Sequence, residues 1–70
     1  MFTYDPKRNV WTRRLGEALA TIHPPEPGSH RFRWTYHHPA WGEVFATSKS
    51  LAKAMKKSRK LHKFVTKGTA

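Results

Sequence analysis

The sequence predicts an α+β fold, a single small domain made of a helix, a two-stranded antiparallel hairpin and a basic amphipathic helix. Apolar residues recur at spacings of three and four over 6–22 and again over 48–65, which is typical of helices. Between these segments, residues 30–37 alternate apolar and polar side chains, as a half-buried strand does. With 70 residues the chain has room for one domain, expected over 1–67, with a frayed tail at 68–70.

The first helix is expected to begin at Asp5-Pro6. Aspartate is a favourable N-cap and proline suits the first helical position. Gly16 lies inside this segment and would cost about 1 kcal/mol within a helix. The apolar face that defines the prediction consists of Trp11, Leu15, Ala18, Leu19 and Ile22.

The central part of the chain predicts a stiff connector followed by the hairpin. Residues 23–29 contain three prolines and a Pro-Gly pair, which favour an extended path and a turn. Residues 30–37 form the first strand, 38–42 the turn and 43–47 the second strand. Phe32, Trp34 and Tyr36 alternate on one face of the first strand, and Phe32, Trp34 and Phe45 are interpreted as core. The alternative is a stacking platform for single-stranded nucleic acid.

The last helix is the segment on which the functional interpretation depends. Thr47 or Ser48 is expected to cap it, and Gly68 to end it. Its apolar side carries Leu51, Ala54, Met55, Ser58, Leu61 and Val65. Its opposite side carries a line of lysines at spacings of four and three, namely Lys49, Lys53, Lys56, Lys60, Lys63 and Lys67.

The charge of this segment points to an anionic partner. The chain has 14 lysines and arginines against four acidic residues, a formal net charge of +10. Eight of the positive charges and no negative ones fall within 49–67. Solvated helix faces usually mix both signs, and like charges four residues apart destabilise a helix. The line is therefore interpreted as a surface for nucleic acid or an acidic protein, with a merely solvated face as the alternative. A membrane-surface helix is disfavoured, because the apolar side of the segment lacks tryptophan and is needed for the fold.

The candidate contact residues come from the helix and from the hairpin. Arg31 and Arg33 flank the aromatic strand, and Trp41 lies in the turn, where it either packs under the turn or anchors a partner. Phe64 falls on the lysine side as a second apolar contact. The full candidate set is Lys49, Lys53, Lys56, Lys57, Lys60, Lys63, Lys67, Arg31, Arg33 and Trp41.

Catalysis, metals and cofactors find little support in the sequence. The four carboxylates are scattered, and neither a nucleophile motif nor a glycine-rich phosphate loop occurs. The chain lacks cysteine, and its five histidines do not have metal-ligand spacing. We therefore expect a non-enzymatic protein with no cofactor and no metal. An apolar run long enough to span a membrane is absent as well, and the first residues lack the apolar core of a signal peptide.

In size, charge and lack of motif, the whole chain resembles the small phage-encoded regulators that bind host RNA polymerase. The resemblance implies a transcription regulator that binds a polymerase subunit in the bacterial cytoplasm and modulates initiation or termination. We expect such a protein to be monomeric. The alternative is a basic nucleic-acid-binding module, with a DNA-binding, ribosomal or architectural role, that acts through the lysine-rich helix.

Overall fold

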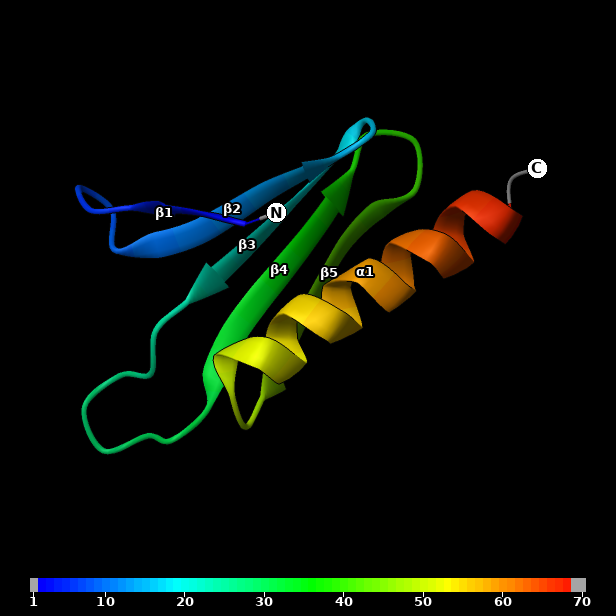
Figure 1. Cartoon of the computed structure of the whole chain (residues 1–70). Coiled ribbons are helices and arrows are strands. Elements are labelled where there is room, and N and C mark those ends of the chain that lie inside the picture. Colours follow the sequence, from blue (N-terminus) through cyan, green and yellow to red (C-terminus); the bar gives the residue numbers. More distant parts are fainter. Residues whose placement is uncertain (1, 69–70) are drawn as a thin grey trace.

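The computed structural model describes residues 2–68 and shows a five-stranded antiparallel sheet followed by one helix (Figure 1). The strands lie in the sheet in the order in which they occur in the chain. Their bounds are β1 Thr3–Asp5, β2 Val10–Leu15, β3 Ala18–His23, β4 Phe32–His38 and β5 Gly42–Ser48, and α1 spans Leu51–Gly68. The predicted arrangement of helix, hairpin and helix is therefore wrong, because the first half of the chain is sheet.

The segment predicted as the first helix forms the hairpin of β2 and β3. Leu15 pairs with Ala18, so the loop consists of two residues, and Gly16 in its first position has a φ of 62°. Glycine at this position with positive φ is typical of a hairpin turn whose twist matches the strands. The helical prediction placed Leu19 on the buried apolar face. In the sheet Leu19 points to the opposite side from Ala18 and Ala20 and is 39% exposed.

Asp5, predicted as a helix cap, ends β1 and stabilises the turn into β2 instead. The backbone N–H of Lys7 donates to the Asp5 carboxylate at 3.0 Å, and the N–H of Asn9 donates to the Asp5 carbonyl at 2.8 Å. Asn9 adopts a φ of 53°, a left-handed conformation that asparagine tolerates better than most residues. The Asp-Pro pair therefore marks a turn rather than a helix start.

The hairpin of β4 and β5 confirms the predicted antiparallel pair of strands. Trp34 pairs with Ala46 and Tyr36 with Val44, so these four side chains point to the same side of the sheet. Trp34 and Tyr36 are buried on that side and Phe32 is partly buried there, as expected of a core strand. The core interpretation of Phe45 is wrong, because Phe45 pairs with Thr35 on the other side of the sheet and is 73% exposed.

The core lies between this side of the sheet and α1, which packs on β3, β4 and β5 (Figure 1). The helix turns Ala54, Ser58 and Val65 inward, as its predicted apolar side requires. Its N-cap is Ser50 rather than Thr47 or Ser48, because the Ser50 hydroxyl accepts from the Lys53 N–H at 3.2 Å. Gly68, predicted to begin the frayed tail at 68–70, is instead helical, and residues 69–70 of that tail lie outside the described residues.

Two features of this arrangement matter for function. The hairpin of β1 and β2 extends beyond the helix, so the helix side of β2 borders α1 without being covered by it (Figure 1). The opposite side of the sheet carries no further layer formed by residues 2–68. Within that part of the chain, no helix is both long enough and apolar enough to cross a membrane.

Candidate functional site

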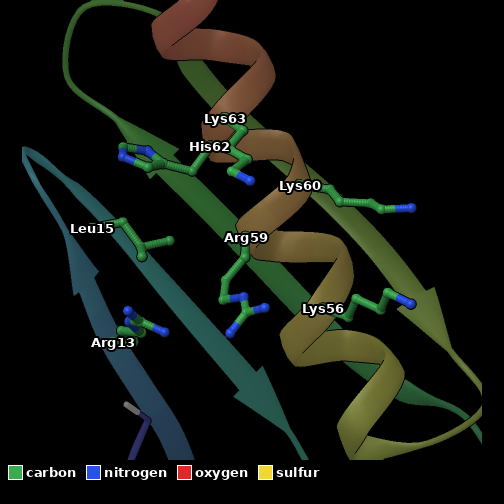
Figure 2. A pocket seen from close by; sticks show the side chains of 7 residues that line it. All are labelled: Arg13, Leu15, Lys56, Arg59, Lys60, His62 and Lys63. Atoms are coloured by element: carbon green, nitrogen blue, oxygen red, sulfur yellow. The ribbon is translucent and has the colours of Figure 1, made fainter.

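A groove of about 450 Å³ lies between β2 and α1, and most of the residues that line it are basic. Figure 2 shows the lining residues, which are Arg13, Leu15, Lys56, Arg59, Lys60, His62 and Lys63. Two of them come from β2 and five from the helix. The groove therefore exists only when α1 packs on the sheet beside β2.

Strand parity places Arg13 in the groove. Arg13 pairs with Ala20, which is fully buried under the helix, so both side chains point to the helix side of the sheet. From the opposite wall Arg59 extends into the space between α1 and the strands, whereas Lys56 and Lys60 extend outward (Figure 2). Arg13 is thus half-buried in the groove and Arg59, although exposed, is directed toward the strands, while Lys56 and Lys60 lie on the outer rim.

His62 connects the groove to the core. Its Nδ1 lies 2.8 Å from the hydroxyl of Tyr36, a side chain with no solvent exposure. Burial raises the pKa of the Tyr36 phenol, so that this hydroxyl stays neutral at physiological pH. On another side the ring faces the turn between β2 and β3, where a Cβ at Gly16 would lie 3.8 Å from Cε1 of His62. The imidazole is therefore oriented by the Tyr36 hydroxyl and lies beside the turn at Gly16.

A second hollow of about 320 Å³ adjoins the first, because Arg13 and Arg59 line both. Its other lining residues are Phe2 and Met55, which pack on the edge of the hydrophobic core. The two arginines therefore lie between a strongly basic hollow and a more apolar one.

Within residues 2–68, the linings of both hollows include no carboxylate. Two of the four acidic residues pair elsewhere: Glu26 lies 2.9 Å from Arg33, and Glu43 lies 3.6 Å from His37. The positive charge of the groove is therefore not neutralised by an acidic side chain of its own lining.

The predicted lysines divide into two groups. Lys56, Lys60 and Lys63 line the groove together with the arginines. The remaining candidates on α1 and just before it are exposed but do not line it, namely Lys49, Lys53, Lys57 and Lys67. Phe64 is 71% exposed, as its position on the lysine side predicted.

The candidates from the hairpin lie elsewhere. Arg33 alternates with the buried Trp34 and so points to the uncovered side of the sheet, away from α1. Arg31, just before β4, is held against β5, because its Nε donates to the Thr47 hydroxyl at 2.9 Å. Trp41 is 44% exposed and contacts Tyr36 edge to face, with ring centroids 6.4 Å apart. Neither arginine nor Trp41 lines the groove.

Sequence reasoning missed three groove residues: Arg13, Arg59 and His62. The helical interpretation of 6–22 gives Arg13 the wrong neighbours. Arg59 and His62 lie between the lysine line and the apolar face, at positions that the periodicity assigns to neither set. The available signal was Gly16, since a hairpin turn at that glycine would have placed Arg13 opposite a small buried residue.

Other chemistries have less support. Among residues 2–68 there is no group of three or more histidine, aspartate or glutamate side chains placed to hold a metal ion. Comparisons with models of protein families, with curated proteins and with solved structures found no match.

Proposed function

We propose that this protein is a non-enzymatic nucleic-acid-binding module that holds a phosphate backbone along α1 and in the groove between α1 and β2. The observation that carries the proposal is the groove lining, where five cationic side chains from two elements gather and no carboxylate of residues 2–68 joins them. Neutralising phosphates is the main source of affinity for proteins that bind nucleic acids.

The kinds of side chain and their placement suit this role. Arginine presents a planar fork that matches two phosphate oxygens. The backbone of Arg13 is held in β2 by its pairing with Ala20 of β3. The rim lysines act as point charges on flexible stems, which can follow a backbone of varying conformation. Repulsion among the helix charges is relieved when an anionic backbone binds, so the otherwise unfavourable charge pattern supports the same function.

The predicted binding of RNA polymerase, in a bacterial cytoplasm, stays a prediction. An acidic protein surface would also be attracted by the lysines, and the exposed Phe64 would supply an apolar anchor outside the groove. We place nucleic acid first because Arg13 is half-buried in a groove, where a flat protein surface reaches it less easily than a phosphate does.

The test compares two triple variants with equal loss of charge, one within α1 and one within and just before it. The groove variant replaces Lys56, Lys60 and Lys63 with glutamine, and the control replaces Lys49, Lys53 and Lys57. Binding to labelled DNA and RNA oligonucleotides is followed by fluorescence anisotropy between about 50 and 200 mM salt. Glutamine keeps helix propensity and side-chain length, so both variants should fold.

The groove variant should bind more weakly, and the slope of log affinity against log salt should fall by about 0.7–0.9 for each phosphate that the variant no longer neutralises. The control should show smaller changes in affinity and in slope. Equal changes in the two variants would show that only net charge matters. Failure of the parent to bind any oligonucleotide, combined with retention of RNA polymerase from nuclease-treated bacterial lysate, would refute the proposal in favour of the polymerase prediction.

A further inference from the structure

The two adjoining hollows differ in chemistry, and this difference bears on whether the bound nucleic acid is a duplex or a single strand. The larger hollow presents Lys63 and His62 beside the arginines, and the smaller one presents Phe2 and Met55. A duplex offers phosphates on its outside and keeps its bases stacked and paired within. A single strand offers phosphates and unpaired base faces together.

We propose that the groove binds a single-stranded segment, with phosphates on Arg13 and Arg59 and a base against Phe2 and Met55. The inference rests on the proposed function and narrows it to one class of ligand. The arginines suit the phosphates because they line both hollows, so a backbone that passes over them has the apolar residues on one side.

The size and walls of the groove support this class. The hollows measure about 450 and 320 Å³. Both values fall in the range of sites that enclose small ligands, roughly 300–1,000 Å³. One wall is the strand β2 and the other is α1 (Figure 2). A rigid duplex would rest on the outward lysines, and a base could enter only after leaving the stack, at the cost of unpairing.

His62 adds a polar group at the side of this site. Its Nδ1 is engaged by the buried Tyr36 hydroxyl, while the residue still lines the basic hollow. Nε2, the nitrogen that Tyr36 does not engage, lies beside the β2–β3 turn, 3.9 Å from where a Cβ at Gly16 would be, so a ligand meets it at that end of the groove, where it can donate or accept according to the tautomer. A ring fixed in this way is suited to a hydrogen bond with a base edge or with a sugar hydroxyl.

The experiment compares a mixed-sequence single strand, as DNA and as RNA, with the duplex of the same DNA sequence. We expect at least one single strand to bind about tenfold more tightly than the duplex at moderate salt. Phe2→Leu keeps apolar volume but removes the ring, and should weaken single-strand binding several-fold while leaving duplex binding unchanged. Arg13→Gln should weaken single-strand binding as well, because it removes a phosphate contact inside the groove, and should change duplex binding little, because a duplex rests on the outward lysines. Phe45→Leu is the matched control, since Phe45 is exposed on the other side of the sheet.

The outcomes separate this inference from the proposed function. Duplex binding as tight as single-strand binding, or an unchanged affinity in Phe2→Leu, would overturn the inference and leave the proposed function standing. Binding of no probe would overturn both. Backbone amide shifts on titration with the single strand give an independent measurement. Shifts at Arg13, Arg59 and His62 support the site, and shifts confined to β4 and β5 refute it.

Discussion

Replacing Trp34 with alanine should remove most of the stability of the fold. Trp34 is 4% exposed, and its indole N–H donates to the buried Ser48 hydroxyl at 3.1 Å. Truncating a buried tryptophan costs about 3–5 kcal/mol, and the unpaired serine hydroxyl adds about 1–3 kcal/mol. A domain of 70 residues has about 4–10 kcal/mol in total, at about 0.05–0.15 kcal/mol per residue. Trp34→Ala should therefore lose its cooperative transition.

Urea unfolding followed by far-ultraviolet circular dichroism measures this effect. Trp34→Phe keeps a ring but removes the donor, so it should cost less than the alanine variant. Phe45→Ala is the control on the neighbouring strand, where the side chain is 73% exposed and the change should stay within about 0.5 kcal/mol. A midpoint for Trp34→Ala equal to that of the parent, or a larger destabilisation in Phe45→Ala, would refute the assignment of the core side.

Three further perturbations test the turns, the helix cap and the pH dependence. Gly16→Ala should destabilise the fold by about 1–2 kcal/mol because φ is 62° there, and Gly16→Asn should cost less. Equal melting temperatures of the parent and both variants would contradict the assigned turn. Ser50→Ala should cost about 0.5–2 kcal/mol by removing the N-cap, which lowers the midpoint of urea unfolding. Ser50→Asp should keep the parent's midpoint, because aspartate is also a favourable N-cap. The pKa of His23 is lowered by partial burial and then by the charges of Arg33 and Arg8. The unfolded chain therefore binds a proton more readily, so stability should fall as the pH drops through about 6.5, and His23→Gln should flatten that part of the profile. An unchanged profile in the variant would exclude His23 as the cause.

The sequence predicted the second half of the fold because only one periodicity fits each segment there. The alternation of Phe32, Trp34 and Tyr36 cannot be wound into a helix with one apolar face, and the lysine spacing of α1 cannot be laid out as a strand. In the first half both patterns fit. Trp11, Leu15, Ala18 and Ile22 share a helical face, and they also share a strand face, because the two-residue loop at 16–17 restores the alternation.

The candidate site could be predicted only in part for the same reason. Lysines on one helix face follow from local spacing, so Lys56, Lys60 and Lys63 were found. Arg13 joins them through its cross-strand pairing with Ala20, and that depends on the register of a hairpin. Register is set by turn geometry and by burial, which a helical interpretation of the segment excludes. A site that combines a helix face with a strand needs the tertiary fold before its members can be identified.

The strand order has a consequence for how the protein forms during synthesis. Each strand pairs with its neighbour in the chain, so the sheet can assemble hairpin by hairpin as residues leave the ribosome, without waiting for distant partners. The side that carries Ile22, Trp34 and Tyr36 has no cover until α1 packs on it. The nascent sheet therefore exposes its apolar side during this interval, and the helix that closes it also brings half of the chain's lysines and arginines. Folding and acquisition of the basic surface are completed in the same step.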